Sequence, residues 1–178
     1  MKTLIATVAT AAVVAAFPIA AAAQNMPVQG SASLGYSQGD YDGGADLGTI
    51  QGRLGARFGQ YLGVEGELGL GVKDDDTYVG ALKADNSVKH QAGVYGVGYL
   101  PVSPNADLYA RVGYGDTKVK TKVAGIPDSD SAQSWNYGVG GQYFFDGKNG
   151  VRADYTRHEF LHGDDKADVA SVAYVHKF

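Results

Sequence analysis

Apolar and polar residues alternate along most of this chain beyond residue 27. The closing segment ASVAYVHKF places Val172, Tyr174 and Phe178 on one face, and Ser171 and Lys177 on the other. A period of two residues is typical of a β-strand whose two faces meet different environments. The segment therefore predicts a final strand that ends on an aromatic residue. A strand in that position needs a partner, because a bare edge pairs with other chains.

Eight segments repeat this alternation, each of about ten residues. They are VQGSASLGYS, TIQGRLGARF, LGVEGELGLGV, HQAGVYGVGYL, DLYARVGYG, WNYGVGGQYFF, GVRADYTRH and the closing segment. The fourth is apolar on both faces, so its pattern leaves its orientation open. An even number of strands of this length predicts an all-β fold, an eight-stranded antiparallel up-and-down transmembrane β-barrel.

The connections between these segments alternate in length. Those after the second, fourth and sixth are short: GQY, PVSPNA and DGKNG. Those after the first, third, fifth and seventh are longer and polar: QGDYDGGADLG, KDDDTYVGALKADNS, DTKVKTKVAGIPDSDSAQS and EFLHGDDKAD. This arrangement is typical of an outer-membrane barrel with periplasmic turns and external loops. In such a barrel the eighth segment pairs with the first, and no edge remains.

A soluble lipocalin-like barrel has the same number of strands but an apolar ligand cavity and a polar exterior. The polar faces here carry Arg, Glu, Asp, Gln and Ser, which is too much charge for an apolar pocket. Aromatic residues occupy the apolar faces, many near segment ends, as interfacial girdles would. They are Tyr36, Phe58, Tyr114, Trp135, Tyr143, Phe145, Tyr155, Tyr174 and Phe178. The pattern favours the membrane barrel.

The N-terminal stretch predicts export. Lys2 precedes an apolar run, and small residues with an A-x-A pattern precede Gln24. These features indicate a secretory signal peptide over residues 1–23 and a mature domain over residues 24–178. A membrane-anchoring helix is the alternative, but the run is rich in weakly apolar alanine and contains Pro18.

Composition narrows the chemistry. The chain has 178 residues, no cysteine and a formal net charge of −4. The absence of cysteine excludes disulfides and thiolate chemistry, and the acidity argues against a nucleic acid partner. The length suits one domain after export.

The stretches YGVGYLPVSP (residues 95–104) and LYARVGYG (residues 108–115), with the terminal Phe178, resemble the small eight-stranded outer-membrane β-barrels of Gram-negative bacteria. These proteins are of the OmpA/OmpX type, also called porin-family or opacity-like. The resemblance implies a monomer in the outer membrane, in contact with lipid and lipopolysaccharide. It also implies a barrel-assembly machinery that recognises the last strand through Val172, Tyr174 and Phe178. His176 stands where an aromatic residue is more usual.

Charged residues of the polar faces are expected inside the barrel. If the apolar faces of the second and third segments coincide, a turn at residues 59–61 pairs Phe58 with Leu62. Arg53 then lies across from Glu67, and Arg57 lies diagonal to Glu65.

The expected interior charge network consists of Arg53, Arg57, Glu65, Glu67, Arg111, Arg152 and Asp154, with Lys177 extending it. Because an eight-stranded barrel is just wide enough for side chains to fill, the network is interpreted as a plug. An ion pathway lined by the same charges is the alternative.

The long connections carry acidic clusters, at Asp40, Asp42 and Asp46 and at Asp74, Asp75 and Asp76. They are interpreted as solvated loop tips, since neither has the ligand spacing of a calcium loop. Divalent bridging to lipopolysaccharide phosphates is the alternative for these clusters. Lys118, Lys120 and Lys122 share one face of an extended strand and could contact such phosphates directly.

Catalysis is not indicated. A lipid hydrolase of this size needs a serine nucleophile and a histidine base near the outer rim. Ser87 lies near His90 in sequence, but no third group orients them, and His158, His162 and His176 are scattered. No enzyme activity, metal site or cofactor is predicted. The predicted function is a structural envelope role with surface interaction through the loops. A narrow passive channel and a host or surface adhesin are the alternatives.

Overall fold

The computed structural model describes residues 27–41, 45–73, 75–79, 82–123, 126–161 and 166–178. The strands are β1 (Val28–Tyr41), β2 (Ala45–Phe58), β3 (Leu62–Lys73), β4 (Asp75–Val79), β5 (Leu82–Ser103), β6 (Ala106–Val123), β7 (Ile126–Phe144), β8 (Asn149–Phe160) and β9 (Lys166–Lys177). Within these ranges, no helix has the length and apolarity needed to cross a membrane.

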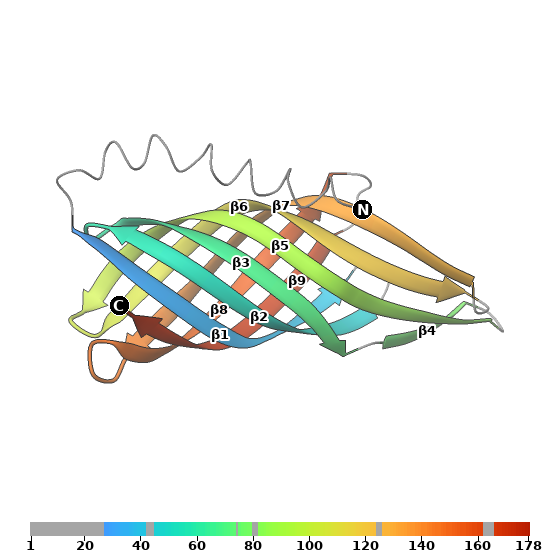
Figure 1. Cartoon of the computed structure of the whole chain (residues 1–178), viewed down its shortest axis with the longest axis horizontal. Helices are drawn as coiled ribbons and strands as arrows, with labels where there is room; N and C mark the ends of the chain where they lie inside the picture. Colours follow the sequence, from blue (N-terminus) through green and yellow to red (C-terminus); the bar gives the residue numbers. More distant parts are fainter. Residues whose placement is uncertain (1–26, 42–44, 74, 80–81, 124–125, 162–165) are drawn as a thin grey trace.

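The strands close into a barrel (Figure 1). Each consecutive pair from β5 to β9 and from β1 to β3 is antiparallel, β3 pairs with β5, and β1 pairs with β9. The short strand β4 continues the line of β3 along β5, so the closed wall has eight strands. The predicted fold is confirmed, and the last strand pairs with the first as expected.

The short turns lie at one end of the barrel. The turn at residues 59–61 pairs Phe58 with Leu62, as predicted, and Gly59 adopts a φ of 64° there. The β7–β8 turn likewise uses Gly147, with a φ of 80°. Glycine tolerates this left-handed region, which other residues rarely adopt. The start of β1 and the end of β9 lie at this same end (Figure 1).

The opposite end differs from expectation. Most of the segments predicted as long polar loops continue as paired strand, so that Lys118 pairs with Ser131 and Lys122 with Pro127. The reason is visible in TKVKTKV, where alternating β-branched residues favour extended backbone. Strands β5, β6 and β7 consequently extend further than their neighbours (Figure 1).

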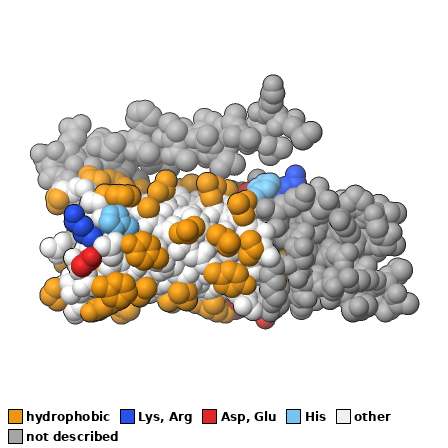
Figure 2. Space-filling model, turned by 60° about the horizontal axis from the view of Figure 1, so that its bottom comes forward, with side chains coloured by type: hydrophobic (Ala, Val, Ile, Leu, Met, Phe, Trp, Pro, Cys, Tyr) orange, Lys and Arg blue, Asp and Glu red, His pale blue; other side chains and the backbone are white. Residues whose placement is uncertain are grey.

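The two faces of the wall differ as the alternation predicted. Leu34, Leu54 and Leu68 point outward and are 64%, 68% and 70% exposed, whereas the residue before each of them, Ser33, Arg53 and Glu67, is buried. Figure 2 shows apolar side chains over the middle of one face, with charged and histidine side chains towards its two ends. An apolar band between polar rims matches a barrel in a bilayer.

The structure also orients the fourth predicted segment. Tyr95, Val97 and Tyr99 of β5 are buried inside, and Leu100 points outward. Since hydroxyl groups of buried tyrosines need partners, the charged interior suits Tyr95 and Tyr99 better than the lipid face does.

Candidate functional site

The charged residues predicted for the interior come from four strands and meet in the lumen. Strand alternation sends Arg53 of β2, Glu65 and Glu67 of β3, Arg111 of β6, and Arg152 and Asp154 of β8 inward, and all six are buried. Because water is largely excluded at such positions, each charge needs a partner of opposite sign.

Arg53 is the centre of the cluster. Its Nε lies 2.7 Å from Glu67 Oε2, the residue that the register places across from it. Its Nη1 and Nη2 atoms also donate to both oxygens of Asp154, at 2.6 and 3.0 Å, across the lumen. Arg111 Nη2 donates to the same Glu67 oxygen at 2.7 Å. Two arginines and two carboxylates therefore neutralise one another.

Arg152 and Glu65 form a second buried pair. Nη1 and Nη2 of Arg152 donate to the two carboxylate oxygens of Glu65 at 2.8 and 3.2 Å. Tyr99 donates to Glu65 at 3.2 Å, and Tyr109 donates to Asp154 at 2.8 Å. The Tyr109 hydroxyl also accepts from Nε of Arg152 at 3.1 Å and so connects this pair to the cluster around Arg53.

Arg57 lies nearer the short-turn end and takes a different partner from the one predicted. Its guanidinium donates to both oxygens of Asp107, at 3.0 and 3.2 Å, and to the backbone oxygen of Gln60. Gln142 donates to Asp107 at 2.8 Å. The diagonal neighbour Glu65 is held by Arg152 instead, because side chains in a narrow lumen reach across it as easily as along the wall.

Lys177, expected to extend the network, lies over an aromatic ring. Its Nζ is 3.4 Å from the ring centre of Phe144, an arrangement that stabilises a cation. This contact lies on the inner face, beside the short turns.

Three inward tyrosines of β5 and β6 were missed as members of the network. The guanidiniums of Arg111, Arg57 and Arg152 lie 3.5, 4.4 and 4.6 Å from the ring centres of Tyr95, Tyr99 and Tyr109. The signal was present for Tyr109, which shares the polar face of its segment with Asp107 and Arg111. It was absent for Tyr95 and Tyr99, whose segment was apolar on both faces.

Two inward glycines make room for these rings. A Cβ atom at Gly113 would lie 2.6 Å from the ring of Tyr95, and one at Gly140 would lie 2.6 Å from the ring of Tyr109. Both contacts are too close for a side chain. The rings therefore occupy lumen volume that glycine leaves open.

Beyond the arginines, towards the long hairpins, the buried polar side chains that the structure describes carry no formal charge. Asn136 donates to the hydroxyl of Tyr95 at 3.0 Å and accepts from Ser134 at 2.7 Å. His158 is buried here at 2% exposure. The Nε2 atom of Gln51 has no hydrogen-bond partner within the described part of the chain.

The residues of the predicted assembly signal lie on the outer wall, from the middle of β9 at Val172 to the short-turn end at Phe178. Val172, Tyr174 and Phe178 are 63%, 50% and 72% exposed. The backbone N–H of Phe178 donates to the Gly30 carbonyl at 2.9 Å, which extends the seam between β9 and β1 to the last residue.

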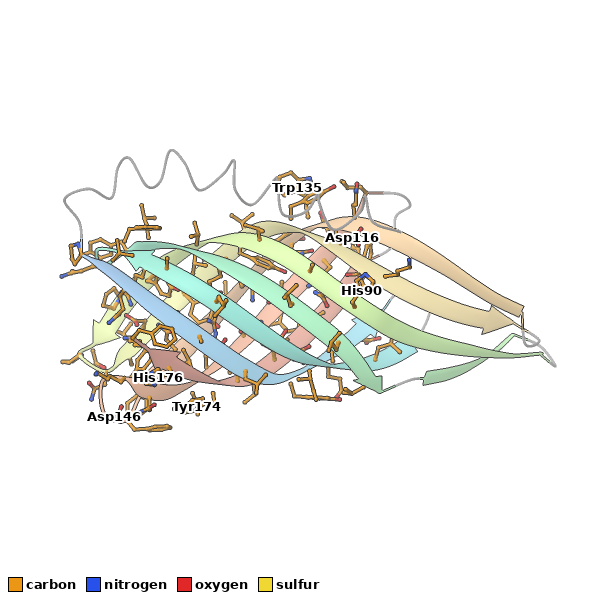
Figure 3. The ribbon with its side chains drawn as sticks, viewed as in Figure 1. His90, Asp116, Trp135, Asp146, Tyr174 and His176 are labelled. Carbon is orange, nitrogen blue, oxygen red and sulfur yellow. The ribbon has the colours of Figure 1, made fainter. Side chains whose placement is uncertain are left out.

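A polar cluster accompanies them (Figure 3). Tyr174 donates to Oδ1 of Asn149, and Nδ1 of His176 lies 2.7 Å from the same oxygen. Asn149 in turn donates its amide to Asp146 at 2.6 Å. Backbone N–H groups of Asn149 and Lys148 also donate to Asp146, and these bonds lower the pKa of its carboxyl to about 2.

Other candidate residues are scattered. Asp40 is exposed at the hairpin end, whereas Asp42, Asp74 and His162 lie outside the described residues, and the side chains of Asp46, Asp75, Asp76, Ser87, Lys120 and Lys122 do too. His90 and His176 lie towards opposite ends of the barrel (Figure 3), and His158 is inside it. Within the described part of the chain, no three histidine or acidic residues group as metal ligands would.

Comparisons with known proteins agree with this geometry. The family model described as outer membrane protein beta-barrel domain matches residues 9–178. The fold is similar to Ail of Yersinia pestis (TM-score 0.64, 21% identity, 86% of this chain and 100% of that chain). It is also similar to Neisserial surface protein A (TM-score 0.59, 10% identity, 85% of this chain and 97% of that chain). The N-terminal β-barrel domain of Pseudomonas aeruginosa OprF is a third similar structure (TM-score 0.57, 13% identity, 84% of this chain and 99% of that chain). No curated protein matches the sequence.

Proposed function

Because this chain belongs to the outer membrane protein β-barrel family, we propose that it is a closed, non-conducting envelope protein that presents its long hairpins outside the cell. The mature protein begins after Ala23, once the signal peptide is removed. It is a monomer in contact with lipid and lipopolysaccharide, and assembly machinery recognises Val172, Tyr174 and Phe178. It has no enzymatic activity.

The pairing of charges across the lumen carries this proposal. Arg53 reaches from β2 to Asp154 of β8, Arg152 reaches from β8 to Glu65 of β3, and Arg111 reaches from β6 to Glu67 of β3. These contacts cross the barrel in several directions. An ion in transit would have to separate buried pairs that are held by one or two hydrogen bonds each, and this is costly in a water-poor lumen.

A narrow channel is the alternative that the same residues allow. The test is conductance in planar bilayers, with the wild type compared with Glu65→Gln. We expect no steady unitary conductance from the wild type. We expect new openings from the variant, because loss of the Glu65 carboxylate leaves the Arg152 guanidinium without its charged partner. Glu159→Gln, a change on the outer wall, serves as the control and should stay silent. Steady wild-type conductance with ion selectivity that shifts in Glu65→Gln would show a pore instead.

Surface interaction is the second part of the proposed role. The hairpin of β6 and β7 extends, together with β5, beyond the other strands (Figure 1), and Lys118, Lys120 and Lys122 occupy alternate positions along β6. One structure with a similar fold, at 21% identity, is of Ail in complex with the heparin analogue sucrose octasulfate. Alternating cations on an extended hairpin suit anionic groups at the cell surface, such as lipopolysaccharide phosphates.

A further inference from the structure

A line of small residues runs along the outer wall. Gly66 of β3 pairs with Val94, and Ala92 lies two residues further along β5 towards the hairpin end. Ala92 in turn pairs with Asp116, and Lys118 lies two residues further along β6. Each step is a diagonal between adjacent strands. Since barrel strands are tilted by roughly 35–45°, this diagonal runs nearly along the barrel axis, as the slope of the strands in Figure 1 shows.

Larger side chains border this line on both sides. The same register places Leu54, Leu68 and His90 along one side, and Val64, Val94 and Asp116 along the other. An apolar depression of the wall is lined by Gly66, Ala92 and most of these bordering residues, and it continues past Leu54 and Leu68 to Leu34, Ile50 and Gly52 of β1 and β2. The furrow, as we call it, has Gly66 and Ala92 as its floor and Lys118 at its outer end.

Nothing in the protein itself requires glycine at the floor. A Cβ atom built on Gly66 meets no other atom within 4 Å. Among the described glycines, positive φ angles occur at Gly59 and Gly147. Glycine within a strand is destabilising relative to other residues, and it often marks a site where a ligand approaches the backbone closely. The space above Gly66 is therefore open to a group that packs against the wall from outside.

The outer end of the furrow is polar. Lys118 pairs across the strands with His90, and Asp116 lies two residues before Lys118 on the same face of β6. Figure 3 shows His90 and Asp116 towards the hairpin end of the barrel. Tyr114 and Trp135, which stack edge to face at 5.6 Å, lie beside them on β6 and β7. Such an aromatic pair marks a membrane–water interface.

We propose that the furrow binds one acyl chain of a phosphorylated glycolipid of the outer leaflet, with the phosphate held by Lys118 and His90. Asp116 accepts hydrogen bonds from sugar hydroxyls. The distance from Gly66 to Lys118 is two diagonal steps, roughly 15 Å, which is about half of a hydrocarbon core of about 30 Å. The furrow thus has the depth of one leaflet. This inference rests on the outer-membrane location given under the proposed function.

The test is native mass spectrometry of the folded full-length mature chain in detergent, titrated with bisphosphorylated lipid A. Gly66→Leu places a side chain on the floor at a position where its Cβ meets no atom within 4 Å, and we expect at least a tenfold weaker first binding event. Gly98→Leu is the matched control, because Gly98 also faces outward with open space around its Cβ position but lies outside the furrow. Its binding should equal that of the wild type.

Two further arms separate the headgroup from the chain. Lys118→Gln should weaken binding of bisphosphorylated lipid A severalfold, and the wild type should bind dephosphorylated lipid A equally weakly. Equal competition by phosphatidylethanolamine would overturn the proposal, because it would show ordinary annular lipid. Equal affinities of Gly66→Leu and Gly98→Leu would overturn it too.

Folding of each variant is checked by its heat-dependent shift on gels. If Gly66→Leu does not fold, Ala92→Leu fills the same floor and gives the same two outcomes. Membrane fractionation and conductance of the wild type are separate measurements. If the wild type fractionates with the outer membrane and does not conduct, but shows no preference for lipid A, the result would contradict lipid A binding in the furrow and leave the proposed function intact.

Discussion

Arg152 and Glu65 are the side chains of the lumen that a double-mutant cycle isolates best. Both are buried, and two hydrogen bonds connect them. When one partner of a buried pair is removed, the remaining charge has no compensation, and the free energy of unfolding falls by about 3–5 kcal/mol. The comparable outward pair, Lys166 with Glu159 at 3.7 Å, is 49% and 43% exposed.

We therefore expect Arg152→Gln and Glu65→Gln each to lower the free energy of unfolding in lipid vesicles by about 3 kcal/mol. The coupling energy of the pair should exceed the ~0.2–1 kcal/mol typical of exposed pairs. Urea titrations of the two single variants and the double variant measure it. The cycle on Lys166 and Glu159 is the control, and equal coupling in the two cycles would show that the lumen is as wet as the surface.

Asp146 provides a prediction about pH. Hydrogen bonds from the backbone of Asn149, from its side chain and from the backbone of Lys148 lower the pKa of Asp146 from 3.8 to about 2 in the folded chain. A lowered folded pKa means that these bonds stabilise the turn fully above the ordinary pKa and are lost as the pH falls towards about 2. An NMR titration of the folded protein should give this value, and Asn149→Ala should move it upward by removing the side-chain donor. An unchanged pKa in the variant would assign the whole effect to the backbone.

At the scale of elements, side-chain contacts as well as backbone hydrogen bonds to β1 and β8 hold the end of β9 in place. Because the amide group of Asn149 donates to Asp146, its oxygen is left to accept from Tyr174 and from Nδ1 of His176, so that Nδ1 carries hydrogen. This explains why histidine is suited to a position where the resemblance implied an aromatic residue. Its ring also packs edge to face on Phe178, at 5.4 Å.

Phe178→Ser should lower the yield of folded barrel in outer membranes several-fold. The substitution removes the exposed ring that ends the strand and its packing on His176. The measurement is the fraction of heat-modifiable protein on gels. Phe145→Ser is the control, since Phe145 is 61% exposed on the outer wall beside the same turn region. Equal losses in both variants would mean that lipid contact, rather than the terminal position, determines assembly.

The alternation of polar and apolar residues in the sequence was sufficient to predict which residues are neighbours on adjacent strands of the wall. It predicted that Phe58 pairs with Leu62 and that Arg53 lies across from Glu67, because a turn and a face fix the register of a hairpin. The alternation was not sufficient to predict which side chains meet across the lumen. The partners of Arg57 and Arg152 depend on barrel tilt and stagger, which place distant strands opposite one another. The apolar segment around Tyr95 also gave no orientation, because both of its faces carry similar residues.

At the scale of the whole molecule, the apolar outer wall determines where the protein is stable. The outward leucines of β1, β2 and β3 would be in water if the barrel were soluble. Transfer of apolar surface into lipid is favourable at about 25 cal/mol per Å².

We expect the protein in the outer-membrane fraction, as a monomer that migrates faster on gels before boiling than after it. Membrane fractionation and light scattering in detergent test both expectations. A periplasmic marker processed in parallel serves as the control. Recovery of the protein together with that marker would contradict the proposed location.

The seam between β1 and β9 has a consequence for the order of folding. It joins Ser31 to Lys177, so its residues are separated by almost the whole mature chain, whereas hairpin partners are close in sequence. Contacts of such long range form slowly, because the loop they close is large. Until β9 pairs with β1, the sheet has two unpaired edges. We therefore expect closure of the seam to be a slow step of folding, during which the two open edges can pair with other chains.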